Sequence, residues 1–140
     1  QTVANFVSLV KSGFYNGLTF HRVVDDFMAQ GGDPNGDGTG GSESYIVGEF
    51  SSNGFEGNTL SHTEGIISMA RSSIPNSASS QFFICYGDCT FLDGQYAAFG
   101  KVIEGMETVD NFLKIPRRMS FGGEMSVPAE KIVMKTVEAI

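Results

Sequence analysis

Residues 20–33 read FHRVVDDFMAQGGD, and no other stretch says more about the fold class. Its β-branched and aromatic residues favour one strand over 18–24 and a second over 27–31. Helical spacing of apolar residues predicts a helix over 3–12, with Thr2 as its N-cap and Gly13 as its C′ residue. Four more segments have the composition of strands: 65–71, 81–86, 97–103 and 131–138. A second helix is predicted over 105–114, where apolar residues have helical spacing and Pro116 ends the pattern. The chain should therefore be mainly β, an antiparallel barrel or sandwich plugged by two helices.

The same stretch places a cation in an apolar setting. Arg22 lies among residues that should form an apolar wall, and Gln30 follows within the same local fold. A fixed cation beside an aromatic pocket suits a reaction that makes and breaks no covalent bond. Rotation about a prolyl peptide bond is such a reaction, because its barrier comes from the partial double bond alone.

Length and composition exclude several classes of protein. A chain of 140 residues is one domain by size, and 41% apolar residues supply a core. The formal charge of −7 argues against nucleic acid as a partner, since a basic stripe is the expected footprint. No run of 18 apolar residues predicts a membrane span. Two cysteines, Cys85 and Cys89, are too few for a disulfide framework, which favours free thiols and a cytoplasmic location.

Two glycine-rich motifs between residues 33 and 44 are misleading. Residues 36–41 satisfy G-x-G-x-x-G, but no helical pattern follows them and Asp37 would oppose a phosphate. Residues 33–38 match the first half of a calcium loop, D-x-N-x-D-G, but loop position 12 is Ser44 and Glu43 comes one place early. We expect a solvated turn that binds neither cofactor nor metal, with a calcium-stabilised domain as the remote alternative.

A serine hydrolase is also disfavoured. The G-x-S-x-G motif is absent, and no elbow surrounds Ser42 although it follows two glycines. His62 precedes an apolar strand, and we interpret it as a structural histidine that is hydrogen-bonded at the start of the strand rather than as a catalytic base.

Five short motifs occur in a distinctive order: FHR at 20–22, FMAQGGD at 27–33, SQFF at 80–83, LDG at 92–94 and FGKV at 99–102. In order and spacing they resemble the cyclophilin family of peptidyl-prolyl cis-trans isomerases, over nearly the whole chain. The resemblance implies a cyclophilin-like antiparallel β-barrel capped by two α-helices. It also implies an enzyme that accelerates X–Pro rotation in proline-containing peptides and unfolded proteins and so assists folding. The alternative is a module of the same shape that binds proline-containing peptides with little turnover.

The resemblance also implies roles for individual residues. Arg22 matches the catalytic arginine, and Gln30 matches the residue that contacts the substrate backbone and orients that arginine. Phe27 matches a wall of the proline pocket beside them. The other matched positions bind substrate: the pocket walls Met28, Phe83 and Leu92, the rim residues His21, Phe91 and Tyr96, the backbone segment Ala70-Arg71, and Gly38 and Gln81 of the neighbouring groove.

The chain departs from the family pattern in two side chains. The rim position often held by Trp is Phe91, and the chain contains no Trp, so an indole N–H donor is lost. We therefore expect only weak binding of cyclosporin-type ligands, which use that donor. Arg71 stands where Asn is common, as in bacterial-type members, and the contacts of its backbone should survive.

The start of the chain is a third departure. Cyclophilins resemble eight-stranded barrels in which two strands precede the first helix, whereas this chain begins at that helix. Closing a barrel removes its edges, so dropping two strands would expose backbone and core. We expect a single, N-terminally incomplete domain over 1–140 that lacks the first two strands, which either further N-terminal residues or another chain would supply.

Overall fold

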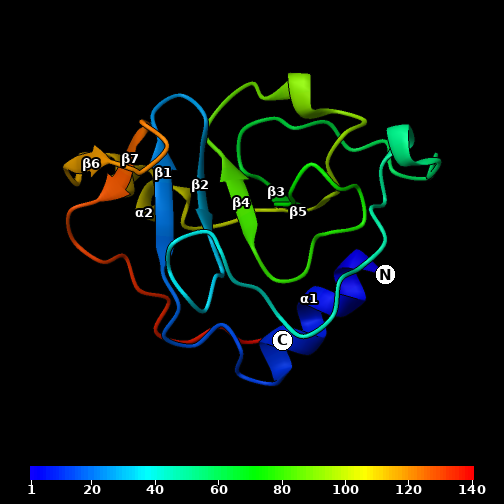
Figure 1. Cartoon of the computed structure of the whole chain (residues 1–140), viewed down its shortest axis with the longest axis horizontal. Helices are drawn as coiled ribbons and strands as arrows, with labels where there is room; N and C mark the ends of the chain where they lie inside the picture. Colours follow the sequence, from blue (N-terminus) through cyan, green and yellow to red (C-terminus); the bar gives the residue numbers. More distant parts are fainter.

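A computed structural model describes all residues, 1–140, and it is mainly β (Figure 1). Five strands form one antiparallel sheet in the order β1-β2-β4-β3-β5, and two more form a separate hairpin. The ladder does not join β1 to β5, so these two are its edges. The strands are β1 Phe20–Val24, β2 Met28–Gly31, β3 Ile66–Met69, β4 Phe82–Cys85, β5 Ala98–Lys101, β6 Arg117–Met119 and β7 Met125–Pro128.

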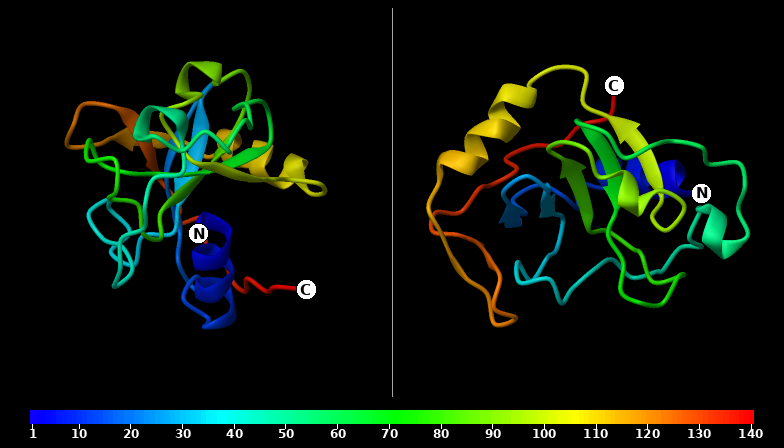
Figure 2. Two further views of the ribbon diagram at one scale, coloured as in Figure 1. Left: turned by 90° about the vertical axis from the view of Figure 1, so that its right-hand side faces the viewer. Right: turned by 90° about the horizontal axis from the view of Figure 1, so that it is seen from above.

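Two helices accompany the strands. They are α1, Thr2–Lys11, and α2, Met106–Asn111, which continues as a 3-10 turn over Phe112–Lys114. Two further 3-10 turns span Ser51–Asn53 and Thr90–Leu92. α1 lies below the strands, and the β6–β7 hairpin lies on the side of β1 away from β2 (Figure 2). None of the helices is long and apolar enough to cross a membrane.

Alternation along β4 explains why the sheet is apolar on both faces. Successive side chains of a strand point to opposite faces. Phe82 and Ile84 therefore join the larger core, together with α1 and α2, whereas Phe83 and Cys85 join a second cluster on the other face. All four residues are buried. We call the second set the pocket cluster: Met28, Ile66, Phe83, Cys85, Cys89, Leu92 and Ala98.

Two successive glycines, Gly31 and Gly32, stand at the end of β2, where the backbone of neighbouring segments comes close to the chain. A Cβ at Gly31 would lie 2.7 Å from the carbonyl oxygen of Thr19. Gly32 has a φ of +86°, and a Cβ there would lie 2.8 Å from the carbonyl oxygen of Ser80. Only glycine meets both demands without strain, which accounts for the GG of residues 31–32 and fixes where the long loop after β2 begins.

The observed elements confirm most of the expected ones, with shorter strands. The prediction of a strand over 131–138 was wrong. This segment touches the sheet through one bridge, between Thr19 and Val133, with the N–H of Phe20 donating to Ile132 and that of Met134 to Leu18. The bridge lies just before β1 begins, and beyond it the segment has no neighbouring strand.

The predicted cap of the first helix was also wrong. Gln1 is the N-cap residue, and Thr2 is the first helical residue. The backbone N–H and the hydroxyl of Thr2 both donate to Glu49, at 2.6 and 2.5 Å, so a carboxylate far along the chain satisfies the helix start. Gly13 follows the C-cap residue Ser12 with a φ of +79°, as expected of a C′ glycine.

Candidate active site

A bulge in β1 aims Arg22 away from the core. The pairing with β2 shifts register between Phe20 and Arg22. Phe20 and Val23 consequently both reach the larger core, although an uninterrupted strand would turn them to opposite faces. Bulges are common where a side chain must be re-aimed. Here the bulge frees Arg22, whose side chain is 36% exposed, to lie opposite Gln30 on the neighbouring strand.

Hydrogen bonds link Arg22 to the loop after β2 through two glutamines. An Nη1–H of Arg22 donates to Oε1 of Gln30 at 2.9 Å. Nε2 of Gln30 donates to Oε1 of Gln81 at 2.8 Å, and Nε2 of Gln81 donates to the carbonyl oxygens of Gly38 and Gly40. Four predicted site residues are thus joined by hydrogen bonds into one polar line, and these bonds restrict the rotation of the Arg22, Gln30 and Gln81 side chains.

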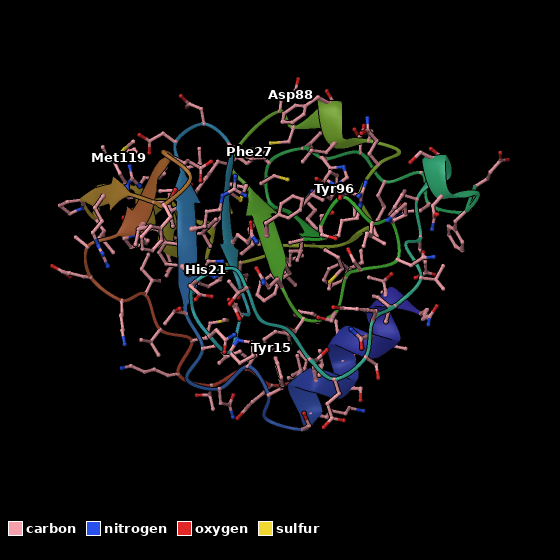
Figure 3. The ribbon with its side chains drawn as sticks, in the orientation of Figure 1. Tyr15, His21, Phe27, Asp88, Tyr96 and Met119 are labelled. Carbon is pink, nitrogen blue, oxygen red and sulfur yellow. The ribbon has the colours of Figure 1, made fainter.

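The apolar walls expected for a proline pocket lie beside this line. Met28, Phe83 and Leu92 are buried in the pocket cluster, and Phe27 and Tyr96 pack against it while partly exposed. The guanidinium carbon of Arg22 lies 5.9 Å from the centre of the Phe27 ring. In Figure 3, Phe27 and Tyr96 flank the upper end of β4. A cation therefore borders an aromatic surface, as the sequence predicts.

The rim of the pocket is aromatic too. Phe91 is 66% exposed, and its ring centre lies 5.7 Å from that of Phe27. The guanidinium of Arg71 lies 4.7 Å from the ring centre of Tyr96, and its Nη2 donates to the carbonyl oxygen of Gln95 at 2.7 Å. The Arg71 side chain thus braces the rim.

A polar groove of about 440 Å³ runs on from Gln30. Four of the predicted substrate-binding residues line it: Gly38, Ala70, Arg71 and Gln81. The N–H of Ala70 is used within the protein, by the carbonyl oxygen of Gln81, but the carbonyl of Ala70 and the N–H of Arg71 have no protein partner. A free acceptor and a free donor on adjacent residues can bind the backbone of an extended peptide.

His21 lies apart from the apolar walls. It sits lower in Figure 3, beside β1, with Nε2 3.8 Å from where a Cβ of Gly38 would lie. It borders a second hollow, between the loop after β2 and β7. Burial lowers the pKa of His21 despite the nearby Asp33, and neither ring nitrogen has a protein hydrogen-bond partner. Contact of His21 with substrate stays a prediction.

His62 is fully buried between two partners. Its Nδ1 lies 2.8 Å from Oδ1 of Asp93, and its Nε2 lies 2.9 Å from the hydroxyl of Ser68. The ring stacks on Phe83, with centres 6.1 Å apart. Asp93, His62 and Ser68 are thus linked by hydrogen bonds in the same order as the acid, histidine and serine of a hydrolase triad. Ser68, however, is 0% exposed, so no substrate can reach it. The interpretation of His62 as a structural histidine is confirmed, and its support of the pocket wall is a finding that the sequence did not predict.

Asp93 makes this network sensitive to pH. Burial alone would raise the pKa of Asp93, but hydrogen bonds from Ser61 and His62 outweigh burial and lower the pKa. A carboxyl whose pKa is lowered in the folded state stabilises the fold at pH values above its unfolded-state pKa, about 3.9. This stabilisation is lost as the pH falls through the folded-state pKa.

Replacing Asp93 by asparagine tests this pH dependence, because Asp93→Asn keeps the Oδ1 acceptor but cannot titrate. We expect it to flatten the dependence of Tm on pH below about pH 4, as measured by thermal unfolding at stepped pH. An unchanged dependence would contradict this account.

The calcium-like stretch is held by its own backbone. Asp33 is 1% exposed, and its carboxylate accepts N–H groups from Asn35, Asp37 and Gly38 at 2.8, 3.1 and 2.6 Å. These bonds occupy the oxygens that a cation would need. No group of three or more His, Cys, Asp or Glu side chains is arranged to hold a metal ion.

Comparison with known proteins agrees with this geometry. The chain matches the family described as cyclophilin type peptidyl-prolyl cis-trans isomerase/CLD over residues 1–139. The chain belongs to the cyclophilin family. It is 44% identical over 116 residues to peptidyl-prolyl cis-trans isomerase-like 3 of Rattus norvegicus, covering 83% of this chain and 70% of that protein. It is 42% identical over 144 residues to peptidyl-prolyl cis-trans isomerase A of the bacterium Dickeya dadantii, covering 99% of this chain and 73% of that protein.

A solved cyclophilin shares the fold. The crystal structure of a cyclophilin type peptidyl-prolyl cis-trans isomerase of Cryptosporidium parvum, in the presence of the dipeptide Ala-Pro, superposes with a TM-score of 0.83. The two are 34% identical, and the match covers 99% of this chain and 85% of that one. The 140-residue chain is therefore a peptidyl-prolyl cis-trans isomerase. The alternative, a binding module with little turnover, is not favoured.

Sequence reasoning missed one residue that touches the predicted catalytic arginine. Glu124, just before β7, accepts two hydrogen bonds from Arg22: Nε to Oε1 at 2.8 Å and Nη2 to Oε2 at 2.9 Å. No strand was predicted over 117–128, because this stretch combines charges and glycines without regular alternation. The resemblance assigned nothing to Glu124 either, so no signal in the sequence pointed to this contact.

Proposed function

We propose that Arg22 is the catalytic group of this isomerase and that the prolyl ring of the substrate lies against Phe27, Met28, Phe83 and Leu92. The observation that carries the proposal is the position of the Arg22 guanidinium, beside Phe27 and hydrogen-bonded to Gln30. The peptide preceding proline would pair with the free backbone groups of Ala70 and Arg71. Residues further upstream would enter the polar groove.

The chemistry follows from the electronics of the amide. Twisting the X–Pro bond ends its resonance and localises a lone pair on the prolyl nitrogen. An N–H of Arg22 aimed at that nitrogen stabilises the twisted state more than either planar isomer, which is what lowers the barrier. Arginine suits this role better than lysine, because its fork is planar, directional and always charged.

The required lowering of the activation free energy is larger than the arginine alone can supply, so the pocket must contribute as well. A rate enhancement of four to five powers of ten requires about 5–7 kcal/mol. One preorganised donor supplies about 3–4 kcal/mol. The remainder would come from desolvating the amide and from holding the prolyl ring still while the preceding residue turns. An arginine that is about one-third exposed is insufficient alone, so the apolar walls are part of the mechanism.

A protease-coupled assay tests the proposal. The peptide carries one X–Pro bond, and the protease cleaves only the trans isomer, so the slow phase reports isomerisation. We expect the protein to accelerate this phase, and to accelerate the refolding of a protein whose slow step is prolyl isomerisation. A folded protein that binds the peptide without accelerating the slow phase would refute the proposed mechanism and favour the binding module.

Phe91 predicts a weak response to cyclosporin. Phe91 offers the rim an aromatic surface but no N–H donor, and it is exposed enough to be reached. We expect Phe91→Trp to tighten cyclosporin binding about tenfold, the value of one net hydrogen bond of about 1–1.5 kcal/mol. Calorimetric titration of both proteins measures the change, with Phe91→Tyr as a control for ring size. Equal affinities of the parent and the Trp variant would contradict the prediction.

We also propose that the protein works in a reducing compartment such as the cytoplasm. Both cysteines are free thiols. Burial raises the pKa of Cys85 to about 12 and also raises the pKa of Cys89, so neither is poised as a reactive thiolate. Cell fractionation with an antibody against the protein tests this location. Recovery from an oxidising, exported fraction would reject it.

A further inference from the structure

The ion pair with Glu124 engages part of the Arg22 guanidinium, the group that we propose acts on the substrate. The carboxylate meets the side edge of the fork, formed by Nε and Nη2, in two short hydrogen bonds. Gln30 takes one N–H of Nη1. A guanidinium has five N–H donors, so three are engaged within the protein. The two that remain, one on each Nη, have no partner within the protein.

Glu124 is itself held in place by its hairpin. Its N–H donates to the hydroxyl of Ser120 at 3.2 Å, and its carbonyl oxygen accepts the N–H of Ser120 at 2.7 Å. β7 then continues directly into Ser126, which is 2% exposed. Hydrogen bonds from Arg22 lower the pKa of Glu124, so it is a carboxylate at neutral pH. The hairpin therefore presents a fixed acceptor to the arginine.

Two effects of this carboxylate on catalysis oppose each other. Its negative charge weakens the field of Arg22 at the substrate, whereas its two hydrogen bonds fix the plane of a side chain with four rotatable bonds. Both side chains are more than a third exposed, at 36% and 37%, so water and salt screen the charge effect. The directional effect is not screened, because it depends on short bidentate contacts. The directional effect should therefore prevail.

We propose that Glu124 is a positioning residue for the isomerase reaction. It holds the Arg22 guanidinium by the Nε edge, while Gln30 holds it from Nη1, so that the plane of the group and the orientation of its two free N–H groups are fixed. The proposal rests on the proposed catalytic role of Arg22. It adds a residue of the β6–β7 hairpin to a site otherwise built from the five-stranded sheet and its loops.

Substitution of Glu124 by glutamine tests the proposal. Glu124→Gln keeps the size of the side chain but offers one acceptor instead of two, and its amide N–H₂ opposes the donors of Arg22. We expect kcat to fall about fivefold to tenfold, with KM within a factor of two, because the loss falls on the transition state. Glu124→Asp should recover part of the loss. Glu130→Gln is the matched control, since Glu130 is exposed and has no hydrogen-bond partner, and it should behave as wild type.

A spectroscopic readout separates positioning from a general structural role. The Nε–H of Arg22 should give a protected proton–nitrogen resonance in the wild type and a broadened or absent one in Glu124→Gln, while Tm stays within a few degrees. An unchanged kcat would overturn the proposal. A higher kcat would also overturn it, because it would show that the carboxylate of Glu124 hinders catalysis by Arg22.

The double variant distinguishes failure of this inference from failure of the catalytic assignment. If Arg22→Ala abolishes activity but Glu124→Gln does not lower it, only the inference falls. If Arg22→Ala is as active as wild type, the proposed role of Arg22 falls as well. If both are correct, Glu124→Gln adds no further loss to Arg22→Ala, because the residue acts only through the arginine.

Discussion

Replacing Arg22 by alanine should lower kcat/KM for an X–Pro peptide by about 10²–10³-fold, the loss that follows removal of one preorganised donor to a transition state. The physical reason is that Arg22 is the cation that lies over the Phe27 ring, whereas Arg71 is turned toward Tyr96 and the carbonyl of Gln95, and Arg117 is paired with Asp25. The protease-coupled assay measures the change. Arg22→Lys should recover only a small part, because a lysine cannot keep the contacts of the fork.

The fold should survive this substitution. Arg22 is about one-third exposed and its ion pair with Glu124 is screened, so Arg22→Ala should lower the free energy of unfolding by no more than about 1 kcal/mol. Arg118→Ala is the matched control: Arg118 is an exposed arginine of β6 that makes no ion pair, and its loss should change neither rate nor stability. A fall in rate of equal size in both variants would show that net charge, rather than the position of Arg22, accelerates the reaction.

Replacing Phe83 by alanine should lower the free energy of unfolding by about 3–5 kcal/mol. Phe83 is 3% exposed in the centre of β4, stacked on His62 and edge-on to Tyr96, so its removal leaves a cavity between the sheet and the rim. Urea unfolding followed by circular dichroism measures the change. This is a large fraction of the roughly 5–15 kcal/mol typical of a whole domain, so we expect partial unfolding on mild heating.

Two milder variants separate the pocket from the core. Phe83→Leu should keep the protein folded and still weaken peptide binding, because the flat wall is lost. Phe91→Ala, at the exposed rim, should cost less than about 1 kcal/mol, since little of its ring is buried. Equal stability losses for Phe83→Ala and Phe91→Ala would contradict the assignment of Phe83 to the buried pocket cluster.

Much of the sheet could be predicted because local composition and burial agree there. β4 illustrates this, since strict alternation sends Phe82 to the larger core and Phe83 to the pocket cluster. The segment 131–138 also contains β-branched residues typical of strands but was predicted wrongly as a strand. Composition says whether a segment can be a strand, whereas pairing depends on which edge is available, and Val133 meets only Thr19.

The site was predictable to the extent that its residues lie in short motifs. Arg22 and Gln30 belong to one continuous stretch and face each other across β1 and β2. The bulge after Phe20 was not foreseen, because a bulge leaves no mark in composition. Glu124 was missed for a different reason: its contact with Arg22 joins positions 102 residues apart. Only the folded position of the β6–β7 hairpin brings them together.

The central claim is that the Arg22 guanidinium lowers the barrier to rotation of a bound X–Pro bond, beyond helping the peptide to bind. The most direct test is the exchange rate between the cis and trans forms of a peptide saturating the enzyme, measured by NMR exchange spectroscopy for wild type and Arg22→Ala. The account predicts that the variant binds the peptide within a few-fold of wild type but interconverts its isomers about 10²–10³ times more slowly. A variant that binds less tightly, yet exchanges the bound peptide at the wild-type rate, would contradict it.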